Sequence, residues 1–373
     1  MIKITEATSK KQLKQFVTFP FKLYKGSKYW VPPIISEEIK TLDKDVNPVF
    51  KDAEARYFLA YKNNEIIGRI AAIINWLEVN GQNEKKMRFG WFDVIDDVEV
   101  TRLLLEKVHD IGKSKDLNYV EGPVGFSNLD KVGILTEGFN EIGSMITWHN
   151  HPYYAEHFKT LGYSVGKTYS ENKMEFKNIH QKFFTRIQTL VKKRYQLRAL
   201  NFTDNKDIMT YADEMFEVFS KSHAVLSSFV EINQDQQDYF KKKFIGFLNP
   251  EYVKFVLDKE NKLVGFGIVT PSYAKALQKM NGKLFPFGFM HLLQAKKKAK
   301  TVTFYLIGVL PEYQNKGVTA IIFEEFWQTF NAKGIELCVR GPELDDNEAI
   351  QKLWKNFKPV THKRRCTFKK NIA

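Results

Sequence analysis

Apolar and polar positions along the chain follow an arrangement that occurs twice. Residues 56–61 and 252–257 are short runs rich in aromatic and β-branched side chains, which is typical of strands. Each run leads through a short polar turn into a second apolar stretch, which contains Gly68 in one case and Gly265 in the other, 197 residues apart. Two strands joined by a short polar turn predict a β-hairpin in each half of the chain.

Two later segments repeat in the same order. Gly-Pro at 122–123 recurs at 341–342, in each case after an apolar strand, and the helical pattern around Phe158 recurs around Trp354. The spacing falls from 219 to 196 residues between these two matches, so the first copy holds roughly 23 extra residues near 128–148. Three matches in one order predict a duplicated domain.

The second copy contains the clearest alternation of strand and helix. Residues 301–309 are a β-branched and aromatic run, residues 318–330 have apolar side chains at helical spacing, and residues 335–339 return as a strand. This pattern predicts a βαβ unit with parallel strands. We therefore expect an α/β fold of the mixed α+β type, in which each copy has a central mixed β-sheet flanked by helices.

The repeat predicts a first domain over 1–177, a connecting helix over 178–194 and a second domain over 195–373. The net charge of +14 is unevenly shared, because residues 1–177 carry +1 and residues 178–373 carry +13. A basic domain suits nucleic acid, an anionic surface or a phosphorylated co-substrate as partner.

Composition and hydropathy exclude several classes of protein. Two cysteines are too few for a disulfide scaffold or a Cys-rich zinc module. The N-terminal residues contain no apolar stretch of signal-peptide length, and the longest apolar tracts are interrupted before they reach membrane-spanning length. We expect a cytoplasmic protein without a membrane span.

The strand at 301–309 is followed by a polar loop that ends at Gly317, where the next helix begins. Such a loop aims unpaired backbone N–H groups and the positive end of the helix at one point, which suits a phosphate. Lys316 adds positive charge, and a glycine allows the backbone to approach a ligand closely. An ordinary βα turn is the alternative interpretation.

The segment Val309-Leu-Pro-Glu-Tyr-Gln-Asn-Lys-Gly-Val resembles the acyl-CoA signature of the GNAT N-acetyltransferase superfamily. In that family this loop cradles the CoA pyrophosphate, and the preceding strand holds the pantetheine arm. Residues 347–357 resemble its second signature, and the whole resemblance covers 195–371 and, more faintly, 1–177. It implies a tandem GNAT protein that uses acetyl-CoA or another acyl-CoA. The implied cofactor-binding residues are Val309, Gln314, Asn315, Lys316, Gly317, Val318, Thr319, Asn347 and Trp354.

The second copy departs from the family at two informative positions. Thr319 stands where a glycine or alanine is usual, and Trp354 replaces the tyrosine that often serves as general acid for the CoA thiolate. An indole N–H can donate a hydrogen bond but cannot act as that acid. Either another group, such as Tyr305 or Tyr313, protonates the thiolate, or acyl transfer is weak or lost.

The first copy departs further. Its corresponding junction, residues 92–99, has no glycine and carries acidic side chains that would repel a pyrophosphate. We expect this copy not to bind CoA and to serve a structural purpose or form a wall of the acceptor cleft. The segment 122–128 follows a strand at the edge of that cleft and is a candidate for acceptor contact.

The leading functional hypothesis is an acyl-CoA-dependent N-acyltransferase in which an acceptor amine attacks the thioester directly. Tyr305, Glu231 and His223 are the candidates for proton transfer. The acceptor, a small-molecule or peptide amine, is not identified by the sequence. No metal is expected, because Pro152 separates the histidines at 149 and 151 from the predicted helix that carries His157.

Two alternatives stay open at this stage. A Fem-type transferase also pairs two GNAT-like domains and uses aminoacyl-tRNA, and the +13 half would suit a phosphate backbone. A pseudo-enzyme that binds CoA or another ligand without turnover would account for the missing tyrosine at Trp354.

Residues 271–300 form an insert that combines apolar side chains with lysines. Packing between the two copies is the leading interpretation of this insert. Its apolar residues are also compatible with an acceptor pocket or with contact to a membrane surface.

Overall fold

The computed structural model describes residues 1–127, 129–179, 181–224, 229–244, 248–354 and 357–372. The elements of the first half are β1 (Ile2–Glu6), α1 (Lys10–Leu23), α2 (Ile35–Leu42), η1 (Pro48–Lys51), β2 (Ala53–Lys62), β3 (Glu65–Asn75), η2 (Leu77–Gly81), β4 (Lys86–Val94), α3 (Val98–Ser114), β5 (Tyr119–Gly122), β6 (Ile134–Glu137), α4 (Tyr153–Thr160), β7 (Ser164–Glu175) and η3 (Phe176–Asn178).

The elements that follow are α5 (Gln181–Tyr195), β8 (Arg198–Asn201), α6 (Asn205–Thr210), α7 (Ala212–His223), α8 (Gln234–Phe244), η5 (Pro250–Tyr252), β9 (Val253–Leu257), β10 (Leu263–Pro271), α9 (Ala274–Met280), α10 (Gly288–Lys298), β11 (Thr301–Val309), η6 (Pro311–Tyr313), α11 (Val318–Lys333), β12 (Leu337–Arg340), β13 (Glu343–Leu344), α12 (Glu348–Trp354) and β14 (Val360–Asn371). No helix in these described ranges is long and apolar enough to cross a bilayer.

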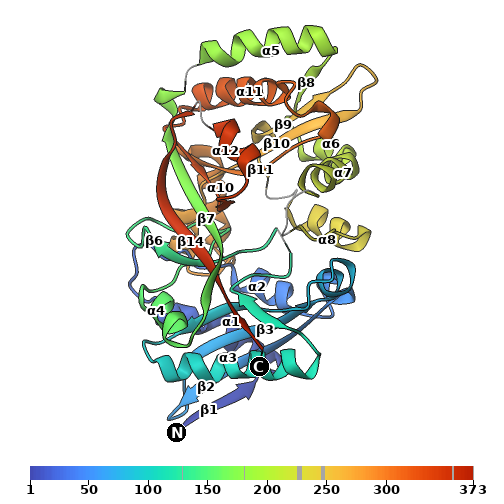
Figure 1. The fold of residues 1–373 in the computed structure, drawn as a ribbon. Helices are drawn as coiled ribbons and strands as arrows, with labels where there is room; N and C mark the ends of the chain where they lie inside the picture. Colours follow the sequence, from blue (N-terminus) through green and yellow to red (C-terminus); the bar gives the residue numbers. More distant parts are fainter. Residues whose placement is uncertain (128, 180, 225–228, 245–247, 355–356, 373) are drawn as a thin grey trace.

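The strands described form one mixed sheet in the order β1-β2-β3-β4-β5-β14-β7-β12-β11-β10-β9-β8. Helices cover its faces, which confirms the expected mixed α/β architecture (Figure 1). Strands β11 and β12 are parallel, with Thr301 opposite Leu337, as the βαβ pattern predicts. The predicted hairpins are also present, as β2–β3 and β9–β10.

The last strands of the two halves are exchanged. Strand β14, at the end of the chain, pairs with β5 of the first half, whereas β7 pairs with β12 of the second half. The two strands also pair with each other along most of their length, and they run side by side between the halves (Figure 1). Each half therefore depends on a strand from the other to continue its sheet.

The repeat is also visible in the register of the two sheets. Gly68 pairs with Val94 in the first half, and Gly265 pairs with Val309 in the second. A Cβ atom on either glycine would lie about 3 Å from a side chain of the helix that follows, 2.9 Å from Val100 in α3 or 3.1 Å from Val318 in α11. The repeated glycine therefore lets a helix cross closely over the sheet in each half.

Candidate functional site

Strand β11 continues beyond the end of β12. Their parallel pairing runs from Thr301 to Phe304 of β11, and Phe304 pairs with Arg340, the last residue of β12. On the other side of β11, Ile268 pairs with Leu306 and Val269 pairs with Phe304, so Tyr305 is the extra residue of a β-bulge. A bulge bends its strand and re-aims its side chain, and it stands here directly after Phe304, the last residue of β11 that pairs with β12.

A cavity of about 260 Å³, here called the β11–β12 cavity, is lined by Tyr305, Leu306 and Ile307 of β11 and by residues that follow β12. Three of the residues singled out from the sequence line it together, Tyr305, His223 and Asn347. The candidate Glu231 is exposed and does not line it. The first half supplies the facing wall, with Val124, Gly125, Ser127, Asp130, Lys131, Lys167 and Tyr169.

The segment expected at the cleft edge, 122–128, thus contributes three residues to this cavity, while Asn128 lies outside the described residues. Asn347 also accepts a hydrogen bond from the backbone N–H of Ile350, at 3.3 Å, and so caps the start of α12.

His223 is arranged to accept a proton. Its Nδ1 lies 2.9 Å from the carbonyl oxygen of Phe219, and because a carbonyl only accepts, Nδ1 carries the hydrogen and donates it. In the neutral ring Nε2 then holds the free lone pair. Burial lowers the pKa of His223, so the neutral, basic form persists to lower pH than in an exposed histidine.

Tyr305 and Asp130 both line the cavity, and the charge of Asp130 acts on Tyr305. Burial, together with the nearby charge of Asp130, raises the pKa of Tyr305, so its hydroxyl keeps its proton at neutral pH. Burial also raises the pKa of Asp130, although its carboxylate accepts a hydrogen bond of 2.9 Å from the backbone N–H of Ser127. Asp130 was not among the residues singled out from the sequence. It belongs to the segment where the first copy has extra residues, and no motif marks it.

The loop after β11 leaves the start of α11 open. Gly317 adopts φ 81°, which favours glycine, and no described side chain caps the first turn of α11. That turn also contains no acidic residue. Gln314 donates its side-chain N–H to the carbonyl oxygen of Val309 at 3.2 Å, which closes the loop on the strand end. Lys316 lies with its Nζ 5.2 Å from the ring centre of Tyr313. The backbone N–H of Ala320 donates to the carbonyl oxygen of Gly317 at 3.0 Å, so the N–H groups that an anion could reach in this turn are those of Val318 and Thr319.

Helix α5 packs directly on this loop. A Cβ atom on Gly317 would lie 2.8 Å from Cγ2 of Val191 and 3.3 Å from Cγ2 of Ile187. The glycine is thus required both by its positive φ and by the helix above it. A substitution of Gly317 would disturb the packing of α5 as well as any ligand.

Trp354 occupies the core beneath the β11–β12 cavity and is not among the residues that line it. The side chain is 2% exposed and packs against Phe304 and Phe323. Its indole N–H donates to Oε1 of Glu343 at 3.1 Å, and the guanidinium of Arg340 lies 4.6 Å from the ring centre. The position that holds the family's tyrosine is here part of an aromatic cluster.

The equivalent strand end in the first half is already occupied by side chains. Val94, which the register matches to Val309, donates its backbone N–H to the Tyr154 hydroxyl at 2.9 Å. Its carbonyl accepts a hydrogen bond of 2.7 Å from the Tyr153 hydroxyl. Both tyrosines come from α4. Neither backbone group of Val94 is available to a pantetheine arm, which gives a physical reason to expect no CoA in this half.

The structure describes the surroundings of two of the histidines that were considered as metal ligands, His149 and His157. Nε2 of His157 lies 3.1 Å from Oδ1 of Asp96, and its Nδ1 lies 2.9 Å from Oγ1 of Thr101. Burial lowers the pKa of His149 to about 4. Within the described ranges, no three His, Cys, Asp or Glu side chains are grouped so that they could hold a metal ion.

A second cavity of about 410 Å³, here called the α10 cavity, lies between the halves. Tyr305, Asp130 and Lys131 line both this cavity and the β11–β12 cavity, so the two adjoin at these residues. The other walls are mainly apolar and come from the segment before α2 and from α9 and α10. The apolar and aromatic lining residues are Val31, Pro32, Pro33, Ile34, Trp91, Leu129, Met145, Ile146, Tyr273, Leu277, Leu284, Phe289, Leu292 and Leu293.

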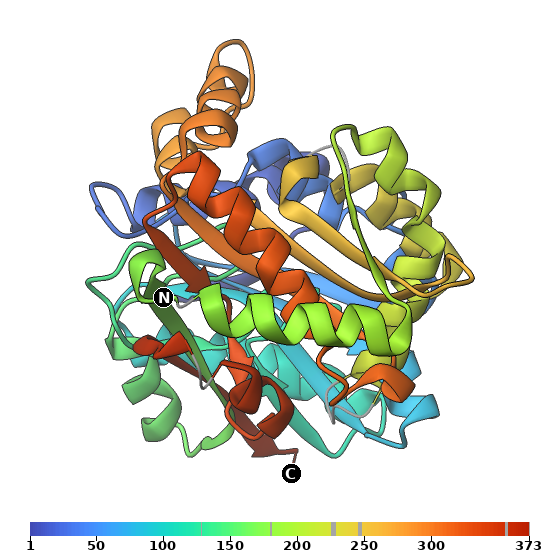
Figure 2. The same ribbon diagram turned by 90° about the horizontal axis from the view of Figure 1, so that it is seen from above.

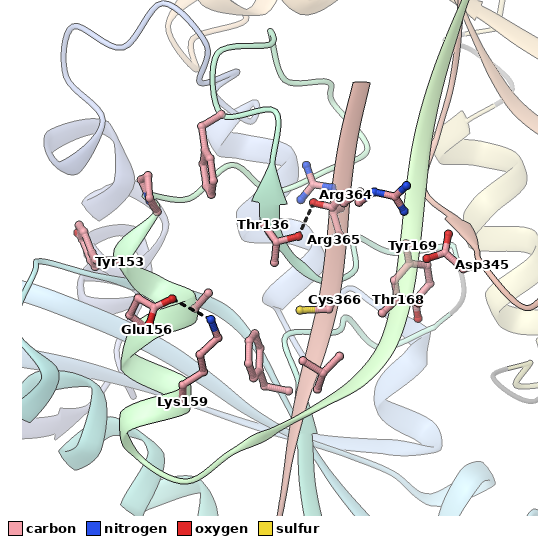
Figure 3. Close-up of a pocket in the computed structure, with 15 residues that line it drawn as sticks. Thr136, Tyr153, Glu156, Lys159, Thr168, Tyr169, Asp345, Arg364, Arg365 and Cys366 are labelled. Atoms are coloured by element: carbon pink, nitrogen blue, oxygen red, sulfur yellow. Dashed lines mark hydrogen bonds and ion pairs between the residues drawn. The ribbon is translucent and has the colours of Figure 1, made fainter. Parts of the chain in front are cut away.

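A larger cavity of about 600 Å³ lies elsewhere in the first half, between α4, β6, β7 and β14 (Figure 3). Its thiol, Cys366, has a pKa raised by burial to about 11 and is therefore protonated at neutral pH. Glu156 and Lys159 pair with each other at its rim, 2.8 Å apart. None of the residues singled out from the sequence lines this cavity, so the candidate site is the pair of cavities that meet at Tyr305.

Comparison with solved structures defines the class of fold. The whole chain aligns with a tandem GNAT protein from the clavulanic acid biosynthesis pathway, covering 99% of that chain, with a TM-score of 0.59 and 8% identity. It also aligns with a probable N-acyltransferase from Enterococcus faecalis, covering 73% of that chain, with a TM-score of 0.52 and 8% identity. At such identities the likeness concerns the fold, and this chain has the tandem GNAT fold.

Two curated proteins are similar in sequence. The chain is 32% identical to Protein YghO of Escherichia coli over 158 residues, which is 42% of this chain and 40% of that protein. It is 27% identical to the bacterial ceramide synthase of Caulobacter vibrioides over 154 residues, 41% of this chain and 40% of that protein. Each match thus spans about two fifths of the relative. No protein-family model matches the chain.

Proposed function

We propose that the protein is an acyl-CoA-dependent N-acyltransferase with one active site, in its second half. The observation that carries the proposal is that β11 extends past the end of β12 toward the uncapped start of α11, with Tyr305 and His223 in the same cavity. The first turn of α11 and Lys316 suit the pyrophosphate of CoA. The edge of β11 that extends past β12 suits its pantetheine arm.

The residues of the site divide the proton transfers between them. His223 takes a proton from the acceptor amine through Nε2, and the amine nitrogen forms a bond to the thioester carbonyl carbon. A backbone N–H near Val309 polarises the carbonyl oxygen. As the carbon–sulfur bond breaks, Tyr305 gives its proton to the departing sulfur, so that CoA leaves as the thiol. Tyr305 thus acts as the general acid, which the indole of Trp354 cannot do.

We further propose a long-chain amine as acceptor. The mainly apolar α10 cavity begins at Tyr305 and suits a hydrocarbon chain, while its polar end holds Asp130 and Lys131 next to the reacting groups. The similarity to a bacterial ceramide synthase supports the same class, because a ceramide is the amide of a fatty acid and a long-chain amino alcohol.

The proposal is tested by a substitution that prevents CoA binding and leaves the fold intact. Thr319→Glu places a carboxylate in the first turn of α11, where it stabilises a helix by about 0.3–1 kcal/mol but repels a pyrophosphate. We expect loss of CoA binding by calorimetry and loss of thiol release with a long-chain amino alcohol and acyl-CoA. Ala332→Glu makes the same charge change at an exposed position in the last turn of α11 and is expected to change neither.

The same measurements distinguish the alternatives. CoA binding without thiol release over a panel of amines would indicate a pseudo-enzyme. Salt-dependent binding of aminoacyl-tRNA that Thr319→Glu leaves intact would favour the Fem-type transferase. Normal activity of Thr319→Glu would exclude the start of α11 as the CoA site.

A further inference from the structure

Helices α9 and α10 form a hairpin that projects from the body of the molecule (Figure 2, orange). Its outer part exposes large apolar side chains in one short stretch. Phe285 is 72% exposed, Phe287 71%, Met290 55% and Leu293 53%. A contiguous apolar surface of this kind marks a contact with another molecule or with a membrane.

The hairpin is also strongly basic. Residues 272–300 contain seven lysines and no acidic residue. Six of these lysines are exposed, and none of the seven forms an ion pair with a residue that the structure describes. The exposed lysines are Lys275, Lys279, Lys283, Lys297, Lys298 and Lys300. The apolar tip is thus surrounded by uncompensated positive charge.

The base of the hairpin is fixed to the first half. The side-chain N–H of Gln278 donates to the carbonyl oxygens of Lys28 and Trp30, at 3.0 and 2.9 Å. The backbone N–H of Ile35 donates to the carbonyl of Gly282 at 3.0 Å. The inner face of α9 therefore packs between the halves, as expected for this insert, whereas the tip and the outer face of α10 do not.

We propose that this hairpin docks the protein on the surface of an anionic membrane. Phe285, Phe287 and Met290 enter the boundary between headgroups and acyl chains, and the lysines around them bind the anionic headgroups. The positive charge of the hairpin favours an anionic membrane over a second copy of the chain as its partner. Two such hairpins in contact would repel each other, because both are positively charged. Phe289 and Leu293 belong both to this surface and to the wall of the α10 cavity, so the cavity lies next to the bilayer.

The experiment is co-sedimentation of the full chain with vesicles. We expect binding to vesicles of phosphatidylcholine with phosphatidylglycerol, weakened by salt, and little binding to phosphatidylcholine alone. Lys297→Gln with Lys298→Gln is expected to weaken binding roughly thirtyfold, from about 1 kcal/mol for each lysine near an anionic surface. Phe285→Ser with Phe287→Ser is expected to weaken it by about tenfold or more.

Matched variants control for charge and for apolar exposure elsewhere. Lys10→Gln with Lys11→Gln removes two exposed charges from α1, and Leu190→Ser removes a side chain that is 62% exposed on α5. Both should bind anionic vesicles as the unaltered chain does. Equal binding to neutral and anionic vesicles, unchanged binding of the hairpin variants, or a dimer in solution that Phe285→Ser with Phe287→Ser dissociates would each overturn the proposal. Because vesicle binding needs no turnover, its outcome is independent of the proposed activity.

Discussion

The backbone N–H of Val94 donates a 2.9 Å hydrogen bond to the hydroxyl of Tyr154. Val94 has the same position in the first half that Val309 has in the second, opposite the repeated glycine. In the first half a side chain from α4 thus satisfies the strand end. The residue that matches Tyr154 in the second half, 196 residues later, is Ile350, which has no hydroxyl that could bond to the strand end. Hydroxyls from α4 therefore close the strand end of the first half, whereas in the second half the side chain of Gln314, from the loop itself, bonds to the carbonyl oxygen of Val309.

The closed strand end predicts a single CoA site. Titration calorimetry should give one acyl-CoA per chain. Tyr154→Phe leaves the N–H of Val94 buried without its hydroxyl partner and should lower the free energy of unfolding by about 1–3 kcal/mol, with the stoichiometry unchanged. Tyr119→Phe, whose hydroxyl donates to Glu84 at an exposed position, should cost less than about 1 kcal/mol. A second CoA bound to the unaltered chain would contradict this assignment.

The buried His223 predicts how the rate depends on pH. Burial disfavours the protonated ring and lowers the pKa of His223, so the basic form persists below pH 6.5 and the rate should fall only at lower pH. His223→Gln should remove this acidic limb and lower kcat by about 100-fold or more. The control is His109→Gln, at a half-buried histidine whose pKa is also lowered by burial. It should change neither the acidic limb nor kcat. An acidic limb that survives in His223→Gln would assign the base to another group.

The sequence was most informative where structure is local. The hairpins and the β11–α11–β12 unit followed from the spacing of apolar side chains, and the start of α11 followed from Gly317. The exchange of β7 and β14 could not be predicted, because both segments have the pattern of a terminal strand and nothing local selects the neighbour. Asp130 and the inward turn of Trp354 likewise depend on contacts between distant segments. The insert at 271–300 was expected to pack between the copies, which α9 and the inner face of α10 do, whereas Phe285 and Phe287 at its tip are exposed.

The exchanged strands predict that neither half folds alone. Residues 1–177 would lack β14 beside β5 and would leave both edges of β7 unpaired. We expect each of the fragments 1–177 and 178–373 to lack a cooperative unfolding transition, and the two to associate when they are co-expressed. The control is a full chain cleaved by a protease between 178 and 181 after folding, which should stay intact as a complex. A monomeric, cooperatively unfolding 1–177 would disprove this interdependence.

A buried charge cluster holds the exchanged strands together. Glu171 of β7 is 1% exposed and binds Arg365 and Lys363 of β14, the latter at 3.3 Å. Glu171→Gln leaves two buried cations without their anion and should lower the free energy of unfolding by about 3–5 kcal/mol. Glu175→Gln, at an exposed position of the same strand, should cost less than about 1 kcal/mol.

The cost of Glu171→Gln should depend on pH. Burial alone would raise the pKa of Glu171, but the charges of Arg365 and Lys363 outweigh burial and lower it. A carboxyl whose pKa is lower when folded stabilises the protein above its unfolded pKa, about 4.3, and loses that contribution as the pH falls through the lower, folded value. Urea unfolding of both chains should therefore show the difference at pH 7 and a smaller one below about pH 4. If the difference in the free energy of unfolding between the two chains did not change with pH, the lost stability would come from packing alone.

The α10 cavity predicts selectivity for acceptor length. Met145 lines this cavity and is 42% exposed, so Met145→Trp should narrow it with little effect on stability. Thiol release should fall about tenfold or more with an amine of sixteen carbons and stay unchanged with a short amine, because only the long chain reaches past Met145. Met209→Trp replaces the same residue type at 43% exposure, on α6 and outside the cavity, and should affect neither amine. An equal loss with both amines would place the chain of the acceptor elsewhere.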